Sequence, residues 1–439
     1  MKRIYFLLAL LCTAFTQVQA QKATDFVKRE GQMFTLGGRP YYYIGTNYWY
    51  GALLGSTGEA GNRERLRKEL DLLKKAGVTN LRVLAGAEGP NNQPYRVSPG
   101  LQLSPGVYND TLLAGLDFLL AEMTKRDMKA VLYLNNAWEW SGGFSQYVNW
   151  NTKVPIPYAL ANNNDWANFM KYSGQFHQCD PCKQQFADHV KFMLGRTNQF
   201  TKKKYTDDPV IMAWQIANES RAFSMVNVPA YDQWIKSTAA LIKSLDKNHL
   251  VSTGSEGSHG SEGSMDVFKQ VHTDPNIDYF TMHIWPRNWG WLDNKNLAGT
   301  LDAAITKTME YMDRHISFAR EQQKPIVLEE FGLQRDNNEF SPSAKTTHRD
   351  QYYQQVFERV LQSAQAKDAL AGANFWAFNG TARPKPTRHF WKPGDDLMGD
   401  PPQEEQGLYG VFDTDSTMPL VAKYSKAVMK AGKKGKGRK

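Results

Sequence analysis

The stretch "PIVLEEFG" (325–332) combines an apolar start with two adjacent glutamates. A short apolar run without polar alternation is typical of a strand buried on both faces, as in a parallel sheet. Neighbouring side chains of a strand point to opposite faces, so we expect only one of Glu329 and Glu330 to reach a given cleft. A charge at the end of a buried strand is costly unless it is paired or used. The stretch therefore predicts a buried parallel strand that ends in a paired or functional carboxylate.

Seven other stretches have the same apolar, β-rich character, and an amphipathic helical pattern follows each of the eight. The predicted strands are 41–45, 80–84, 129–135, 210–216, 250–254, 278–284, 325–330 and 372–378. The predicted helices are 62–77, 112–127, 182–197, 230–246, 264–273, 301–323, 344–366 and 419–431. This alternation favours a single (β/α)8 barrel. A doubly wound sheet would need a glycine-rich phosphate turn after its first strand, and "IGTNYWYG" (44–51) is not one.

The two ends of the chain differ from this body. Residues 1–20 combine a basic start, twelve mainly apolar positions and a small-residue site ending at Ala20, which predicts a cleaved signal peptide. About 20 apolar residues would be needed to cross a bilayer, so we expect no membrane span. Residues 430–439 are rich in glycine and lysine and predict a disordered basic tail. We expect a secreted or periplasmic monomer with one catalytic domain over 21–429.

The formal net charge of +9 belongs mostly to these two ends. Eight lysines and arginines but no acidic residues lie in 1–20 and 430–439, which leaves +1 on the body. A nearly neutral body argues against a nucleic-acid partner. Only Cys179 and Cys182 follow the signal segment, as "CDPC". A redox site would need a thioredoxin-like context, and zinc would need two more ligands, so we expect a short-range disulfide at a helix start.

Charged and polar residues gather where predicted strands end. Arg82 lies in the second strand, "WQIANES" (214–220) leads into Asn218 and Glu219, and His283 lies at the end of the sixth. A salt-bridge layer across the barrel mouth would explain any one of them. Two carboxylates on different strands, beside arginine, asparagine and histidine, instead favour glycoside hydrolysis, in which one carboxyl protonates the leaving oxygen and the other attacks or activates water.

The connections after three strands are long, at about 136–178, 285–300 and 379–415, and loops of this length are uncommon without a function. They contain many of the 12 tryptophans, in "NNAWEWSGG" (135–143) and "IWPRNWGW" (284–291). Tryptophan in a polar loop offers a flat surface on which a sugar can stack. We therefore expect the loops at the barrel mouth to bind carbohydrate.

Several of these motifs resemble glycoside hydrolase family 5, in the clan of (β/α)8-barrel retaining glycosidases. They are "QIANES" (215–220), "VLEEFG" (327–332), "HIWP" (283–286) and "ANFWAFNG" (373–380). The runs "GTNYWYG" (45–51), "VSTGSEG" (251–257) and "GDPPQEEQGLYGVFDTDST" (399–417) resemble its β-mannanase subfamily more narrowly. The resemblance spans most of residues 30–428. It implies a barrel whose catalytic glutamates follow strands 4 and 7.

The resemblance assigns roles to residues. Glu219 matches the acid/base and Glu330, directly before Phe331, matches the nucleophile. The remaining matches surround the reacting sugar: Asn218 at its 2-hydroxyl, Arg82 beside the nucleophile, His283 beside the acid/base, Trp376 as the floor of the −1 site, and Arg221 at the leaving-group sugar, with Trp138 and Trp289 as stacking platforms.

Two departures from the family pattern bear on the site. Ser220 stands where family members often have proline after the acid/base glutamate. Trp285 stands where a tyrosine often binds the nucleophile, and an indole donates a hydrogen bond but does not titrate. Glu329 should then point away from the cleft, toward the helical layer or a loop, and need a cation or amide partner there.

We therefore predict an exported retaining endo-β-1,4-mannanase that hydrolyses mannan, galactomannan or glucomannan with no cofactor and no metal. An exo-β-mannosidase is the nearest alternative, because the loops at 136–178 and 379–415 could wall off one end of the cleft. A β-1,4-glucanase of the same family is a second alternative. A glycan-binding protein without activity is a third, but it would be expected to lack one of Glu219 and Glu330.

Overall fold

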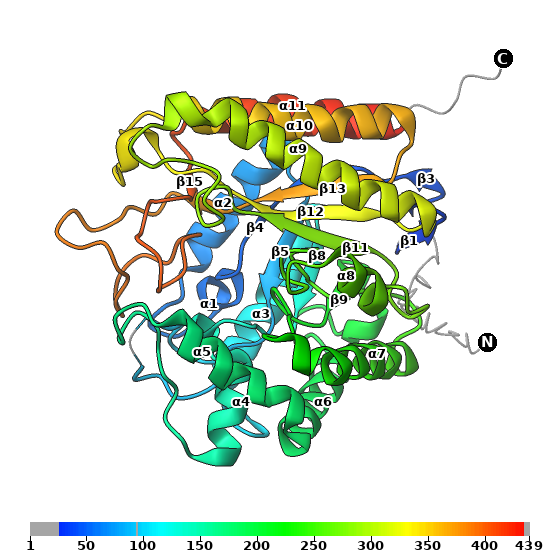
Figure 1. The fold of residues 1–439 in the computed structure, drawn as a ribbon, viewed down its shortest axis with the longest axis vertical. Coiled ribbons are helices and arrows are strands. Elements are labelled where there is room, and N and C mark those ends of the chain that lie inside the picture. The colour runs from blue at the N-terminus through cyan, green and yellow to red at the C-terminus, as the bar shows by residue number, and fades with distance from the viewer. Residues whose placement is uncertain (1–25, 94, 434–439) are drawn as a thin grey trace, which may run out of the picture.

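The computed structural model describes residues 26–93 and 95–433, so the predicted signal segment 1–20 lies outside the described residues. Its main sheet has eight parallel strands in the order β10-β9-β8-β5-β4-β13-β12-β11. Backbone hydrogen bonds from Asp278 to Val251 and from His283 to Glu256 bridge the two edge strands, β10 and β11. Helices surround the sheet (Figure 1), which confirms the predicted (β/α)8 barrel.

The observed elements match the predicted ones closely. The barrel strands are β4 (Tyr43–Asn47), β5 (Asn80–Leu84), β8 (Lys129–Tyr133), β9 (Ile211–Gln215), β10 (Leu250–Ser252), β11 (Phe280–Ile284), β12 (Ile326–Phe331) and β13 (Leu370–Phe375). The helices that follow them are α2 (Arg63–Ala76), α3 (Asp110–Thr124), α6 (Asp180–Leu194), α7 (Val228–Leu245), α8 (Met265–His272), α9 (Leu297–Glu321), α10 (Thr347–Ala366) and α11 (Thr417–Lys433).

Side chains near the helix ends explain several boundaries. The side chain of Asn62 accepts from the N–H of Arg65 at the start of α2, and Gly77 ends that helix with φ 85°, which glycine adopts without strain. Asn109 and Ser264 cap α3 and α8 in the same way. Each boundary is thus determined by a polar residue or glycine that satisfies helix-end backbone groups.

The helix α11 continues through Lys433, so the prediction of a disordered tail is wrong for residues 430–433. The rest of the predicted tail, 434–439, lies outside the described residues. Nζ of Lys367 donates to the carbonyls of Ala431 and Gly432 at the last turn. These bonds satisfy carbonyls that a helix end leaves unpaired, which extends the helix into the glycine- and lysine-rich stretch.

Further short elements lie outside the predicted barrel. The strands β1 (Val27–Glu30), β2 (Met33–Leu36) and β3 (Arg39–Pro40) form an antiparallel sheet, and Phe34 packs edge-on against Tyr279 beneath the barrel. Other short elements are α1 (Gly51–Gly55), the pair β6 (Gln102–Ser104) and β7 (Val107–Tyr108), and the pair β14 (Phe378–Gly380) and β15 (Val411–Phe412). No helix within the described ranges has both the length and the apolar character needed to cross a bilayer.

The long connection at 136–178 contains two unpredicted helices, α4 (Gly143–Thr152) and α5 (Trp166–Ser173). Cys179 and Cys182 form the predicted disulfide directly after it, at the start of α6. The sulfur of Cys182 also contacts the carbonyl of Tyr147 in α4. This link holds the α4 segment against the barrel helix beside the site.

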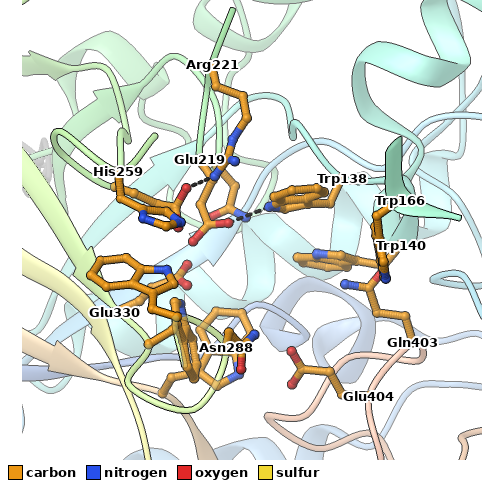
Figure 2. Close-up of a pocket in the computed structure, with 15 residues that line it drawn as sticks. Trp138, Trp140, Trp166, Glu219, Arg221, His259, Asn288, Glu330, Gln403 and Glu404 are labelled. Carbon is orange, nitrogen blue, oxygen red and sulfur yellow. Dashed lines mark hydrogen bonds and ion pairs between the residues drawn. The ribbon is translucent and has the colours of Figure 1, made fainter. Parts of the chain in front are cut away.

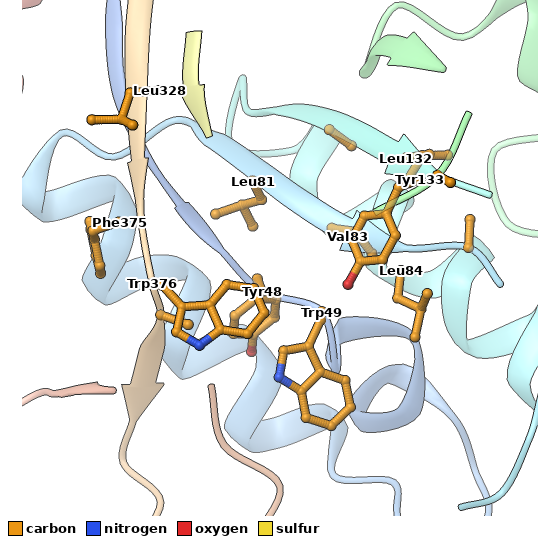
Figure 3. Close-up of a cluster of buried hydrophobic side chains, with 14 of the residues drawn as sticks. Tyr48, Trp49, Leu81, Val83, Leu84, Leu132, Tyr133, Leu328, Phe375 and Trp376 are labelled. Atoms are coloured by element: carbon orange, nitrogen blue, oxygen red, sulfur yellow. The ribbon is translucent and has the colours of Figure 1, made fainter. Parts of the chain in front are cut away.

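The barrel interior changes character along its axis. An apolar cluster that includes Val131, Ala213 and Val327 fills its N-terminal end. A second and larger cluster lies between strands and helices and continues to the barrel mouth, where Trp49 and Trp376 are buried (Figure 3). Polar side chains replace the apolar layer toward the C-terminal ends of the strands, and the site is built on them.

Candidate active site

A pocket of about 390 Å³ opens at the C-terminal ends of the barrel strands, where barrels of this type carry their active sites (Figure 2). The structure brings all ten predicted site residues together here. Arg82 and His283 are fully buried beneath the pocket and contact its glutamates. The other eight line the pocket: Trp138, Asn218, Glu219, Arg221, Trp285, Trp289, Glu330 and Trp376.

Glu219 follows β9 with φ 50°, a left-handed conformation that residues with a side chain rarely adopt. Its backbone N–H donates to the carbonyl of Gly254 at 2.8 Å, which ties this turn to the loop after β10. Ser220 supports the same turn, because its hydroxyl donates to the carbonyl of Thr253. Strain of this kind persists where the surroundings enforce it and is common at functional sites.

Two side chains donate hydrogen bonds to the carboxylate of Glu219. Nδ1 of His283 donates to its Oε1 at 2.9 Å, and the indole N–H of Trp138 donates to its Oε2. Burial lowers the pKa of His283 to about 4, so the ring is neutral above that pH and holds its proton on the nitrogen that faces Glu219. The histidine thus orients the carboxylate without placing a full positive charge beside it.

Arg82, on β5, positions the second glutamate. Its Nη1 donates to Oε1 of Glu330 at 2.5 Å and its Nη2 donates to Oδ1 of Asn218 at 2.7 Å. Nδ1 of His283 lies 3.4 Å from Oε2 of Glu330. These contacts hold Glu330 from the arginine and histidine side, and Trp285 stands where family members often carry a tyrosine. A buried guanidinium with several fixed acceptors is a rigid support for a carboxylate.

Glu329 does not point toward the helical layer or a loop, so that prediction is wrong. Its Oε2 accepts from the amide of Gln215 and lies 3.5 Å from Nε of Arg82, and Tyr279 donates to its Oε1 at 3.3 Å. The strands of Gln215 and Arg82 are not neighbours of β12, so these contacts cross the barrel interior. The expected amide and cation partners are present, but they lie inside the barrel, beneath the pocket.

The reason is an irregularity in strand pairing. The register of β11 against β12 pairs Met282 with Leu328 and the next residue, His283, with Glu330, which leaves Glu329 as an extra residue. A bulge breaks the alternation of side chains and re-aims those beside it. Both glutamates therefore face inward at different depths, and only Glu330 lines the pocket.

One carboxylate oxygen of Glu219, one of Glu330 and one ring nitrogen of His283 all lie within 4.8 Å of one another. Among the described residues, this is the one group of three acidic, histidine or cysteine side chains close enough to hold a metal ion. The indole of Trp138 and the guanidinium of Arg82 already bind oxygens of the two carboxylates, so a cation would have to compete with both. The geometry fits a carboxylate pair that works directly on a substrate.

The two carboxylates differ in their electrostatic surroundings. Burial raises the pKa of Glu330 well above its usual range, and the charge of Glu219 adds to this, while Arg82 opposes it. Burial acts on Glu219 too, but the hydrogen bond from His283, the positive charge that this ring gains below about pH 4, and the charge of Arg221 outweigh it and lower the pKa of Glu219 to about 2. Without substrate, the pair therefore holds one proton, mainly on Glu330, over a broad pH range.

Aromatic side chains form much of the pocket wall. Trp285 packs edge-on against Trp376, with ring centroids 5.8 Å apart, and Tyr409 packs against Trp285 at 4.9 Å. The guanidinium of Arg221 lies over the ring of Trp138 at 4.7 Å and pairs with Glu256. The pocket thus has flat apolar surfaces beside fixed charges, which is a combination suited to a sugar.

Sequence reasoning missed seven residues of the pocket lining. His259 and Glu256 lie in the "GSEGSHGSEG" (254–263) loop, which follows β10. The others come from the long connections and had no signal beyond loop length and aromatic content: Trp140, Trp166, Asn288, Gln403 and Glu404.

Comparison with known proteins agrees with this geometry. The family model described as "GH family 5 beta-mannosidase-like" matches residues 24–433. Mannan endo-1,4-beta-mannosidase 7 of Arabidopsis thaliana is 33% identical over 364 residues, which are 80% of this chain and 77% of that protein. Putative mannan endo-1,4-beta-mannosidase 9 of Oryza sativa subsp. japonica is 32% identical over 384 residues, 84% of this chain and 86% of that protein. Among solved structures, a glycoside hydrolase family 5 mannosidase from Rhizomucor miehei matches with a TM-score of 0.86 and 35% identity over 94% of this chain and 100% of that one.

Proposed function

Because this chain belongs to glycoside hydrolase family 5 and matches its β-mannosidase-like model, we propose that it is an exported hydrolase that cleaves β-mannosidic bonds with retention. The single observation that carries the mechanism is that a carboxylate oxygen of Glu219 and one of Glu330 lie within 4.8 Å of each other. Retaining enzymes hold their two carboxyl groups about 5–5.5 Å apart, whereas inverting enzymes leave about 6.5–9.5 Å for a water molecule.

In the first step Glu330 attacks the anomeric carbon while Glu219 gives its proton to the glycosidic oxygen. The carbon–oxygen bond of the leaving sugar breaks, and an ester forms between the mannosyl group and Glu330. In the second step Glu219 removes a proton from water, the hydroxide attacks the anomeric carbon, and the ester to Glu330 breaks. Both carboxyl groups return to their starting states, so no cofactor is consumed.

The first step needs the shared proton on Glu219, although burial favours it on Glu330 in the empty pocket. A bound substrate reverses this preference. The positive character that develops at the anomeric carbon stabilises the ionised form of Glu330, and the glycosidic oxygen accepts a hydrogen bond only from a protonated Glu219. Arg82 supports the same state, because its Nη1 donates to Oε1 of Glu330 at 2.5 Å and its positive charge favours the ionised form of that carboxyl group.

We infer exo action in place of the endo action predicted from sequence, because Gln403 and Glu404, from the long connection after β14, line one side of the pocket (Figure 2). We call residues 399–410 the end wall. The carboxylate of Asp400 accepts from the backbone N–H groups of Gly407, Tyr409 and Gly410 and so holds the wall in one shape. A mannan chain running along the barrel mouth would meet this folded segment beside the −1 site.

The end wall also presents polar atoms suited to a terminal sugar. Oε1 of Gln403 and Oε2 of Glu404 are buried, and neither has a hydrogen-bond partner among the described residues. Burial and the charges of Asp400 and Glu330 raise the pKa of Glu404 well above its usual range, so this carboxyl group can donate as well as accept. Free hydroxyls of a non-reducing-end mannose would satisfy these atoms, and a further glycosidic bond would not.

Endo action remains the second candidate, because the two plant relatives are named mannan endo-1,4-beta-mannosidases. The Rhizomucor miehei structure is named a mannosidase. Export rests on the sequence of residues 1–20 and agrees with the Cys179–Cys182 disulfide, since such bonds persist in oxidising compartments.

We expect the enzyme to release only mannose from mannohexaose at early times and to leave the viscosity of a galactomannan solution nearly unchanged. Chromatography of the products, with the anomer of the first product followed by NMR, measures both the cleavage mode and the retention. Release of mannobiose and mannotriose from the start would show endo action and overturn the role of the end wall. Parallel assays on cellulose and a mixed-linkage β-glucan test the glucanase alternative, for which we expect no product.

A further inference from the structure

His259 lies at the end of the pocket opposite the end wall (Figure 2). Its imidazole stacks on Trp289, with ring centroids 4.2 Å apart and the planes 22° from parallel. Trp289 packs in turn against Trp291 at 4.9 Å and Tyr311 at 5.2 Å, and the hydroxyl of Tyr311 accepts from the backbone N–H of His259 at 3.0 Å. The ring is thus fixed from behind, although its outer side remains accessible from the pocket.

The position of His259 relative to the two glutamates identifies the part of a substrate that it meets. In Figure 2 His259 and Glu404 lie on opposite sides of the pocket. The charges that act on the ring of His259 are those of Arg221 and Glu219, the proposed acid/base, whereas the charge of Glu330 acts on Glu404. In a retaining reaction the nucleophile lies under the sugar that becomes attached, and the acid lies at the oxygen that leaves. His259 therefore stands on the side of the leaving group.

The chemistry of the ring suits a sugar with free hydroxyls. Partial burial of the ring against Trp289, together with the positive charge of Arg221, lowers the pKa of His259 to about 4. The neutral imidazole has one N–H donor and one acceptor lone pair, and neither ring nitrogen has a hydrogen-bond partner among the described residues. Trp289, predicted as a platform, is covered by His259 on one face, so His259 provides the contact surface there.

We propose that His259, backed by Trp289, binds the first sugar of the leaving group and makes the enzyme select saccharide over non-saccharide leaving groups. The proposal rests on the proposed function, since it assumes that Glu219 protonates the leaving oxygen. It predicts that His259 contributes to kcat/KM for manno-oligosaccharides much more than for aryl β-mannosides, whose leaving groups have no hydroxyls to bind.

The test compares kcat/KM for mannotriose and for 4-nitrophenyl β-mannoside in the wild type and in variants of His259. We expect His259→Ala to lower the ratio of kcat/KM for mannotriose to kcat/KM for 4-nitrophenyl β-mannoside about tenfold. This is the effect of one lost hydrogen bond of ordinary strength. His259→Phe keeps a stacking ring, and His259→Gln keeps a donor and an acceptor. The ratio for each of these variants should therefore lie between that of the wild type and that of the alanine variant. His348→Phe, which changes a histidine outside the pocket, should keep the wild-type ratio.

A ratio within twofold of the wild type in all three His259 variants would overturn the proposal, provided that their melting temperatures match that of the wild type. That outcome differs from failure of the proposed function, in which the wild type would hydrolyse neither substrate. A fall in the ratio with His348→Phe equal to that with His259→Ala would also contradict the proposal.

Discussion

Replacing Glu330 with glutamine is expected to lower kcat on mannotriose by at least about 10⁴-fold, because the amide cannot form the glycosyl ester. The substitution keeps the size of the side chain and an oxygen that can accept from Arg82. The loss should therefore appear in kcat far more than in the melting temperature or in KM. Steady-state kinetics and thermal unfolding of the purified variant measure these quantities.

Glu329 provides the matched control for this variant. It is the neighbour of Glu330 on β12 and contacts the same arginine, but it lies beneath the pocket. Glu329→Gln should lower the melting temperature, because it removes one partner of a buried ion pair, and the folded variant should keep kcat within about tenfold. Loss of turnover in Glu329→Gln with retention in Glu330→Gln would show that the nucleophile is misassigned by one residue.

Replacing Glu219 with glutamine is expected to lower kcat/KM on mannotriose by about 10²–10⁴-fold, the usual contribution of a general acid. Activity on an aryl β-mannoside with a highly acidic phenol should fall much less in the attachment step, because that leaving group departs without a proton. A burst of phenol followed by slow turnover would show that detachment, which needs Glu219 as base, has become limiting. Equal losses on both substrates would contradict the acid role.

Glu219→Gln should also change the pH profile of kcat/KM in a defined direction. The wild type is active while the carboxylate pair holds one proton, so kcat/KM should fall below the lowered pKa of Glu219 and above the raised pKa of Glu330. In Glu219→Gln only Glu330 titrates, and it must be ionised to attack. Activity on the aryl substrate should then rise with pH and reach a plateau, with the basic limb absent.

The fold and the pair of catalytic glutamates were predictable from sequence for physical reasons. Buried parallel strands require uninterrupted apolar runs, and these runs placed all eight barrel strands within a few residues. Parallel strands bring their C-terminal ends to one face of the barrel, so Arg82, Glu219, His283 and Glu330 had to converge once the strands were identified. Family resemblance supplied the roles that periodicity could not.

The details that sequence missed depend on contacts rather than on local pattern. Strand alternation predicted that Glu329 would face outward, but the bulge in β12 turns it inward to Arg82. The shape of the end wall follows from backbone bonds to Asp400, and the place of His259 follows from its stacking on Trp289. None of these features has a period or a spacing that a single sequence displays.

The central claim is that Glu330 forms a covalent bond to the substrate, and trapping that bond tests it most directly. A 2-deoxy-2-fluoro-β-mannosyl fluoride should inactivate the enzyme. Its 2-fluorine slows both attachment and detachment of the sugar, whereas its good fluoride leaving group speeds attachment alone, so the glycosyl ester accumulates. Peptide mass spectrometry should then find one fluoromannosyl group on Glu330, and inactivation should be absent in Glu330→Gln. A label on Glu329, or turnover of the reagent without any labelled peptide, would contradict the proposed mechanism.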